Sequence, residues 1–482
     1  MAKPTVVLLP VWASGHFMPT LEAGKRLVAA LGSGVSLTVL VMRPPTRESA
    51  SQVAAHVARE SATEPGVGGG CEVIFHRLPS VDPPTDCVTV EEFTSRYIHL
   101  HAPHVRAAVA ALPAPAAALV VEFTSTTMLD VARELGVPAY VYFASSAAML
   151  ALMLRLPALH EEVTADFGEM EGQHVHVSGL PPVPASCMPQ SVMSKKSPSY
   201  ADTVYHGGRL TEAEGIIVNT ATELEPAVLA AIAKSQCTPE RPAPPLYPIG
   251  PVIPSDGASS NYDCLQWLDV QSHTSVVFLC FGSLGFLSAE QVREAATGLE
   301  RSGQRFLWAL RASPTVEFRH SSDASILDDL LPDGFLERTK ERGLVWPAWA
   351  PQREILAHPA VGGFVTHCGW NSVLEALWAG VPMAPWPLYA EQHLNAFELV
   401  AAMGVAVRMD VDRKRNNLVE AGELARAVRC LVSGTAEEEE GKRARERAAV
   451  ARDACRKAVA RGGSSYASLH GVAAALRRRL EA

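Results

Sequence analysis

The N-terminal part of the chain follows a strand–turn–helix–strand pattern, which restricts the fold more than any other feature. Thr5–Pro10 is a continuous apolar run of the kind that forms a buried parallel strand. The turn Ser14–Pro19 leads into an expected helix over Leu21–Ala30, and Val35–Val41 is a second expected strand. This order predicts an α/β fold with a doubly wound sheet, whose ligands bind at the C-terminal ends of the strands. His16 falls at that edge of the sheet.

The same kind of pattern begins again after a proline-rich break. Gly215–Thr220 is expected to be the last strand of the first domain, and Pro242–Pro254 is expected to break both helix and strand. Ser275–Phe281 then starts a second doubly wound domain. A chain of 482 residues that is 48% hydrophobic can bury two cores, since single cores stop growing near ~250–300 residues. We therefore expect domains over residues 1–245 and 246–465.

A segment of the second domain, Trp349–Gln392, contains a site suited to a phosphate. The expected strand Gly363–Thr366 runs into the tight turn His367–Gly369 and then into a helix over about Asn371–Ala379. Such a junction presents unpaired backbone N–H groups and the positive end of a helix dipole. An anionic group is therefore expected to bind at this turn.

Side chains in and around the turn extend this chemistry to a whole nucleotide sugar. His367, Asn371 and Ser372 add hydrogen-bond donors beside the expected phosphate. Trp349 can stack on a planar base. Glu391-Gln392 offers the neighbouring acceptors and donors that the vicinal hydroxyls of a sugar require. A base platform, a phosphate site and a sugar-binding pair thus occur in one segment.

This segment closely resembles the signature of plant uridine-diphosphate-dependent glycosyltransferases that act on small secondary metabolites. The leading Trp349, the HCGWNS core at His367–Ser372 and the closing Gln392 stand at that family's spacing. The resemblance covers the whole chain and is weaker outside this segment and the Gly-His motif near the start. It implies the GT-B arrangement, with two facing doubly wound, Rossmann-like domains and an interdomain cleft. It also implies that residues 466–482 form a C-terminal helix that crosses back to the first domain.

The resemblance implies roles for individual residues. Those expected to bind UDP are Ser283, Trp349, Ala350, Gln352, His367, Asn371, Ser372 and Glu375. Those expected to contact the sugar are Trp370, Glu391 and Gln392. Simpler interpretations exist for some of them. Ser372 and Glu375 have the spacing of a helix capping box, and Trp370 and Trp378 could be packing residues.

His16 is the expected catalytic base. A lone histidine after a strand is more often structural, but the resemblance reverses this, because the matching Gly-His turn carries the family's base. The strand Leu119–Phe123 contains Glu122 at the position of the acid that orients the base. The family usually has Asp there, and the extra methylene of Glu changes the reach by ~1.5 Å, one single bond. Asp130, on the following helix, is a weaker alternative partner.

Composition excludes several classes of protein. The net charge of −9 disfavours a nucleic-acid or anionic-membrane surface. The nine cysteines include no C-x-x-C pair, so neither a disulfide framework nor a zinc site is expected. Val137–Leu154 is apolar, but it contains Pro138 and two serines and divides into a strand and a helix start, so we do not expect it to span a membrane. We expect a reduced, cytoplasmic monomer.

Three short motifs mimic other sites. Asp410-Val411-Asp412 matches the D-x-D of metal-dependent transferases, but its basic neighbours favour a solvated charged turn. His99, His101 and His104 are expected to line an acceptor pocket rather than to bind metal, because no carboxylate or cysteine joins them. The glycine-rich segment Glu64–Gly70 follows no strand, so it is not a dinucleotide fingerprint.

The predicted reaction is the inverting transfer of glucose from UDP-glucose to a hydroxyl of a small planar phenolic acceptor of the flavonoid type, without metal or other cofactor. Gln392 favours glucose over galactose, because its amide can both donate to and accept from equatorial hydroxyls. Two alternatives remain open. One is transfer to a carbon of an activated phenol ring, and the other is a non-catalytic binder of nucleotide sugar or phenolic, which the unusual Glu122 favours.

Overall fold

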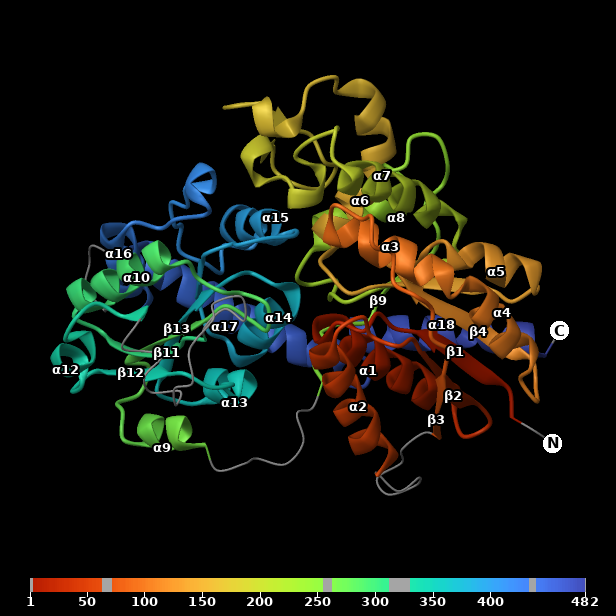
Figure 1. The fold of residues 1–482 in the computed structure, drawn as a ribbon, viewed down its shortest axis with the longest axis horizontal. Helices are drawn as coiled ribbons and strands as arrows, with labels where there is room; N and C mark the ends of the chain where they lie inside the picture. The colour runs from red at the N-terminus through yellow and green to blue at the C-terminus, as the bar shows by residue number, and fades with distance from the viewer. Residues whose placement is uncertain (1–2, 63–71, 255–261, 312–329, 433–438, 482) are drawn as a thin grey trace. The chain divides into compact units, whose positions relative to one another are not determined.

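The computed structural model describes residues 3–62, 72–254, 262–311, 330–432 and 439–481. The chain divides into two compact units, one formed by Met1–Pro254 with Lys457–Ala482 and the other by Ser255–Arg456. This division falls at residues 254 and 456, whereas the sequence placed its boundaries after residues 245 and 465. Each unit is built on a parallel sheet covered by helices (Figure 1).

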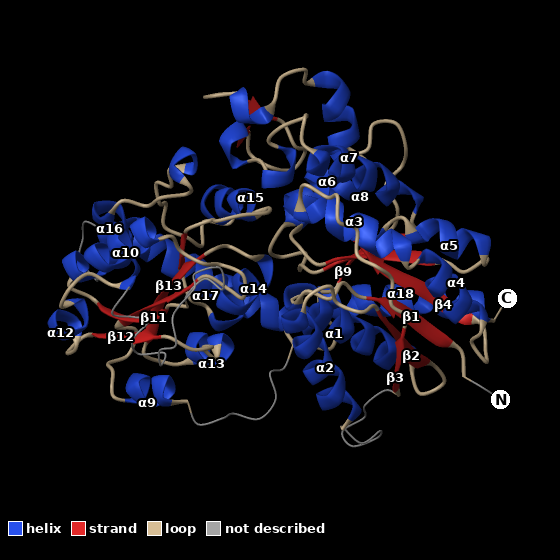
Figure 2. Ribbon diagram, viewed as in Figure 1, coloured by secondary structure: helices blue, strands red, loops and turns tan. Residues whose placement is uncertain are grey.

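The first unit contains a seven-stranded sheet in which every pair of neighbouring strands is parallel (Figure 2). In spatial order the strands are β3 (Val73–Arg77), β2 (Ser36–Val41), β1 (Thr5–Leu9), β4 (Ala116–Glu122), β5 (Ala139–Phe143), β8 (Gly215–Val218) and β9 (Leu246–Pro248). The helices are α1 (Ser14–Leu31), α2 (Arg47–Ser61), α3 (Val90–Leu100), α4 (Ala102–Ala110), α5 (Met128–Glu134), α6 (Ala147–Glu162), α7 (Pro198–Arg209), α8 (Pro226–Ala233) and α18 (Ser464–Leu480). A two-stranded antiparallel pair, β6 (His174–Val175) and β7 (Val183–Pro184), stands apart from the main sheet.

Two elements of this unit differ from the expectation. The residues predicted as a turn before Leu21 are helical, because α1 begins at Ser14 and continues through Pro19. A proline removes one backbone hydrogen bond and keeps a helical φ, so it does not force the helix to start later. The last strand is β9 inside the proline-rich segment, where Pro248 pairs with Val218. An edge strand tolerates proline because one side of it needs no ladder hydrogen bonds.

The second unit contains a five-stranded parallel sheet. In spatial order the strands are β12 (Gly343–Trp346), β11 (Arg305–Ala309), β10 (Val276–Cys280), β13 (Val361–Thr366) and β14 (Met383–Pro385). The helices are α9 (Asp263–Asp269), α10 (Ala289–Ser302), α12 (Phe335–Thr339), α13 (Gln352–Ala357), α14 (Trp370–Ala379), α15 (Gln392–Phe397), α16 (Ala421–Val432) and α17 (Glu439–Val459).

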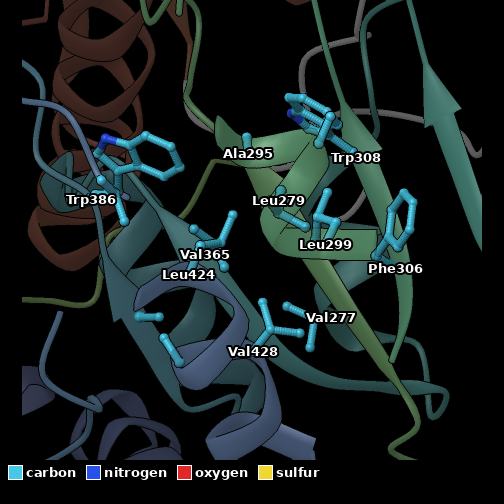
Figure 3. Packing of buried hydrophobic residues seen from close by; sticks show 14 of the residues in the cluster. Val277, Leu279, Ala295, Leu299, Phe306, Trp308, Val365, Trp386, Leu424 and Val428 are labelled. Atoms are coloured by element: carbon cyan, nitrogen blue, oxygen red, sulfur yellow. The ribbon is translucent and has the colours of Figure 1, made fainter. Parts of the chain in front are cut away.

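The core of the second unit lies between its sheet and the helices α10 and α16 (Figure 3). Trp308 from β11 and Leu299 from α10 are fully buried members of this cluster. Leu424 and Val428 of α16 are buried in the same cluster. Because long apolar side chains fill the space between sheet and helices, the strand ends are held rigidly, and loops that follow them can position a site.

Both sheets reverse their strand order at one place. In the first unit the switch lies between β1 and β4, and in the second between β10 and β13. In doubly wound sheets ligands bind outside the C-terminal ends of the strands at such a point. The predicted α/β class with two doubly wound sheets is therefore confirmed. Across the residues that the structure describes, every helix is too short or too polar to cross a bilayer.

Candidate active site

The first switch point brings together the two residues predicted to form the catalytic pair. His16 lies in the first turn of α1, the helix that follows β1, and Glu122 is the last residue of β4. The Nδ1 atom of His16 lies 2.5 Å from Oε2 of Glu122. The Glu122 side chain is buried, whereas 49% of the His16 side chain is exposed. Asp130 pairs instead with Arg209 at 2.6 Å, so the alternative partner was wrong.

The second carboxylate oxygen of Glu122 is also held. The Val11 N–H donates to Oε1 over 2.8 Å, and the Thr20 hydroxyl donates to the same oxygen over 3.0 Å. Thr20 is fully buried and lies one helical turn after His16. The carboxylate is therefore fixed at both oxygens, and only the imidazole faces solvent. Sequence reasoning missed Val11 and Thr20; the spacing of Thr20 from His16 on one helix face was the available signal.

The second switch point contains the tight turn after β13. Cys368 adopts a left-handed conformation there, with φ of 65°. The Asn395 amide donates to the Cys368 carbonyl over 2.9 Å and fastens the turn from α15. Gly369 is the N-cap of α14, without a side-chain cap and with no acidic residue in the first turn. No side chain of the N-cap residue or acidic side chain of the first turn competes for this helix start, and the positive end of the α14 dipole favours an anion there.

This helix start excludes the capping-box alternative. Because Gly369 is the N-cap, Ser372 lies inside α14 and cannot cap it. The hydroxyl of Ser372 instead accepts a hydrogen bond from Gln352 Nε2 over 2.9 Å, and the same nitrogen donates to Glu375 Oε2 over 2.7 Å. Gln352 begins α13, so this contact joins two helices. Three of the residues expected to bind UDP therefore form one hydrogen-bonded group.

His367 fills the space between two glycines. A Cβ atom added at Gly282 would lie 2.6 Å from the Nε2 of His367, and one added at Gly369 would lie 2.5 Å from it. Gly282 also has a positive φ of 73°, which favours glycine. Burial lowers the pKa of His367 to about 4, against a smaller opposite effect of a backbone hydrogen bond with Cys280. The imidazole is neutral at pH 7 and can serve as an uncharged donor.

Trp349 and its neighbours form an open aromatic surface. The Trp349 side chain is 59% exposed, as a base platform must be, whereas Ala350 is buried. The guanidinium carbon of Arg311 lies 5.6 Å from the centroid of the Trp349 ring. Arg311 also donates to the carbonyl of Ser283 over 2.8 Å. Sequence reasoning missed Arg311, which follows β11 and shows no motif.

The residues expected to contact the sugar lie at the starts of α14 and α15. Gln392 is 2% exposed, and its Oε1 accepts from the N–H groups of Leu388 and Tyr389 over 2.8 Å and 3.0 Å. These bonds fix the amide orientation and leave the side-chain N–H₂ as the donor group. Trp370 is 3% exposed, so most of its ring packs in the protein. Glu391 is half-buried directly before α15.

Three further side chains of the segment Trp349–Gln392 complete the description of the site. Tyr389 was not predicted from the sequence as a site residue, and burial raises its pKa to about 12. Trp378 lies under the guanidinium of Arg456, 5.8 Å from ring centroid to guanidinium carbon, in agreement with a packing role. Asn371 is half-buried in the first turn of α14, next to the other expected phosphate donors.

The motifs that mimic metal sites have other structural roles. Asp412 accepts from the backbone N–H groups of Lys414 and Arg415, as expected for a charged turn. His101 is fully buried and bonds to the Tyr97 carbonyl, whereas His99 is exposed. The two rings thus have different surroundings, and their place in an acceptor pocket stays a prediction. In the described ranges no three His, Cys, Asp or Glu side chains gather as metal ligands. The glycine-rich segment Glu64–Gly70 lies outside the described residues.

Comparisons with known proteins find relatives that match nearly the whole chain. A model of the family "UDP-glucoronosyl and UDP-glucosyl transferase" matches residues 254–438. The chain is 55% identical over 470 residues to a malvidin galactosylase of Oryza sativa subsp. japonica, and the match covers 96% of each chain. It is 37% identical to an anthocyanidin 5,3-O-glucosyltransferase of a Rosa hybrid cultivar, covering 97% of this chain and 98% of the other.

A solved structure agrees over the same length. UGT2 of Phytolacca americana, complexed with UDP-2fluoro-glucose and pterostilbene, superimposes with a TM-score of 0.84 at 35% sequence identity. The match covers 98% of this chain and 100% of that chain. This likeness confirms the predicted GT-B fold class.

Proposed function

The chain belongs to the family of UDP-glucuronosyl and UDP-glucosyl transferases, and we propose that it transfers glucose from UDP-glucose to a hydroxyl of a small flavonoid-type phenolic. The observation that carries this proposal is the 2.5 Å contact between the half-exposed His16 and the buried, doubly anchored Glu122. A base held in this way can take a proton from a bound acceptor.

The proposed reaction is a single displacement with inversion. With the proton of the neutral imidazole on Nδ1 toward Glu122, the basic lone pair of His16 is on Nε2. Nε2 takes the phenolic proton as the acceptor oxygen attacks the anomeric carbon, and the bond from that carbon to the diphosphate breaks. The imidazolium that forms is stabilised by the Glu122 carboxylate. UDP leaves with the bonding electron pair.

The leaving diphosphate is stabilised by neutral groups in this proposal. The N–H groups at the start of α14, neutral His367, Asn371, Ser372 and Ser283 bind its oxygens. Trp349 stacks on uracil, Ala350 lies next to the base, and Gln352 with Glu375 binds the ribose. Trp370, Glu391 and Gln392 contact the hexose. We further propose that the enzyme works as a cytoplasmic monomer without metal or other cofactor.

A second donor has specific support. The relative that is 55% identical is named a galactosylase, whereas the relative from Rosa is named a glucosyltransferase. We retain glucose as the proposed donor, with the N–H₂ group of Gln392 donating to the hexose. The Oε1 atom of Gln392 already accepts from the N–H groups of Leu388 and Tyr389, so the amide contributes its donor group alone. Separate reactions with UDP-glucose and UDP-galactose decide between them. A wild-type enzyme with a higher kcat/KM for UDP-galactose contradicts the glucose assignment.

The proposal is tested by incubating the purified protein with each UDP-sugar and a panel of phenolics, followed by mass spectrometry and NMR. We expect a hexose adduct with inverted anomeric configuration, unaffected by excess EDTA and cleaved by mild acid. An adduct that resists acid indicates transfer to carbon. Binding of UDP-sugar and phenolic with no adduct from any pair indicates a non-catalytic binder and contradicts the proposal.

A further inference from the structure

Arg311 links two loops of the nucleotide half of the site. It follows β11, and its Nη2 donates to the carbonyl of Gly282 over 2.6 Å and to the carbonyl of Ser283 over 2.8 Å. Its guanidinium carbon lies 5.3 Å from the ring centroid of Phe286 and 5.6 Å from that of Trp349. The turn after β10 and the aromatic platform after β12 therefore meet on one side chain.

The turn after β10 and the segment with Trp349 after β12 each gain from a side chain that fixes their conformation. Gly282 has a positive φ, and a glycine-containing turn loses much conformational entropy when it becomes fixed. The ring of Trp349 is 59% exposed and so has few packing neighbours of its own. A guanidinium is planar and rigid, donates in its plane and stacks on aromatic faces. Arg311 can therefore hold the turn by hydrogen bonds and the ring by stacking at the same time.

We propose that Arg311 is a positioning residue that presets the base platform and the phosphate-facing turn before UDP-sugar binds. This inference rests on the proposed nucleotide site and adds a residue to it. This role can be distinguished from simple attraction between a cation and the diphosphate. A positioning residue also supports the binding of uridine, which carries no phosphate, whereas a charge that acts on phosphate does not. The charge alone is insufficient, since an ammonium group has no planar face to lie over the rings of Phe286 and Trp349 while it donates to the turn.

Calorimetry with uridine and with UDP tests the inference on wild type, Arg311→Gln and Arg311→Lys. We expect both variants to bind both ligands about tenfold more weakly, in line with the loss of charge-assisted hydrogen bonds and stacking. The KM for UDP-sugar rises similarly, while kcat and the KM for the phenolic change less than about twofold. Arg305→Gln is the matched control, because Arg305 is exposed at the opposite end of the same strand.

Two further variants separate positioning from loss of folding. In a Trp349→Ala background, Arg311→Gln is expected to cost little further uridine affinity, because the platform it holds is gone. Phe286→Leu removes one ring contact from Arg311 and leaves its hydrogen bonds, so we expect a smaller loss with the same pattern. If the losses of uridine affinity caused by Arg311→Gln and Trp349→Ala add in full in the double variant, the inference is overturned.

Other outcomes are also decisive. Wild-type affinity in Arg311→Gln overturns the inference. The inference is also overturned if Arg311→Gln weakens the binding of UDP but not of uridine and Arg311→Lys keeps wild-type UDP affinity. That result shows a charge that acts on the phosphate. A wild-type protein that binds neither UDP nor uridine overturns the proposed function itself, a different failure from that of Arg311.

Discussion

Each of the two sheets has one point where the strand order reverses, and a histidine lies near each point. The two histidines differ in exposure and in their polar partners. In the first unit, half of the His16 side chain is exposed and its Nδ1 contacts the carboxylate of Glu122. In the second unit, His367 is enclosed between Gly282 and Gly369, and burial lowers its pKa to about 4. The first histidine thus meets solvent beside a carboxylate, whereas the second is buried and neutral at pH 7.

This difference shows that the environment, not the residue type or the topological position, assigns the role. A carboxylate partner favours the charged imidazolium that forms when His16 takes a proton. Burial without a carboxylate disfavours charge and makes His367 a donor of fixed protonation. We therefore propose that acid–base work belongs to the first unit and that anion binding belongs to the second. Four substitutions test this division, described in order of decreasing expected effect.

Replacement of the exposed histidine is expected to have the largest effect. His16→Ala removes the base, so kcat for an ordinary phenol at neutral pH should fall ~10²–10⁴-fold, the usual contribution of general base catalysis. The loss is measured in initial-rate assays with saturating UDP-sugar. His76→Ala, at an exposed histidine on β3, is the control and should retain full activity. Full activity of His16→Ala contradicts the assignment.

Replacement of the buried histidine is expected to change the pH dependence of stability. The folded-state pKa of His367 is about 4 and the unfolded value is near 6.5, so the folded state binds fewer protons between these values. The wild-type protein should therefore lose about 2 kcal/mol of unfolding free energy from this group between pH 7.5 and pH 5.

In His367→Asn that part of the pH dependence should be absent. Urea titrations of both proteins at the two pH values measure the difference, in which contributions of the other histidines cancel. Parallel pH dependence in the two proteins would show that His367 titrates normally.

Shortening the orienting acid is expected to have an intermediate effect. Val11 and Thr20 hold one oxygen of Glu122, so removing a methylene draws the other oxygen away from His16. We expect kcat to fall about tenfold in Glu122→Asp, the size of one charged hydrogen bond. Glu134→Asp, at an exposed position of α5, is the control. Activity equal to or above wild type would mean that Glu122 is merely tolerated.

A methyl group in the second switch point is expected to have the smallest effect. Gly282→Ala pushes a Cβ against the His367 ring and strains a positive φ, so the turn must shift. We expect about fivefold weaker UDP binding by calorimetry, equivalent to roughly 1 kcal/mol of strain. An added Cβ at Gly422 meets no atom within 4 Å, so Gly422→Ala serves as control. Unchanged UDP affinity in Gly282→Ala would mean that the fit around His367 is not needed.

The parts of the site that sequence could predict are those with local signals. The strand, turn and helix around His367 follow from a contiguous pattern, whereas the pairing of His16 with Glu122 was predicted through the family resemblance, because a lone histidine after a strand is more often structural. Arg311 could not be predicted, because its contact with Gly282 depends on side-chain direction across two loops. The start of α1 and the strand β9 were missed because Pro19 and Pro248 gave a breaker signal that the tertiary context overrides.

The central claim is that proton transfer and nucleotide binding are separate tasks of the two units. Calorimetric titration of UDP into wild type and His16→Ala tests it most directly. The division predicts dissociation constants that agree within about twofold, while kcat differs by ~10²–10⁴-fold. A tenfold weaker UDP affinity in a folded His16→Ala protein would contradict it, because the base would then also be part of the nucleotide site.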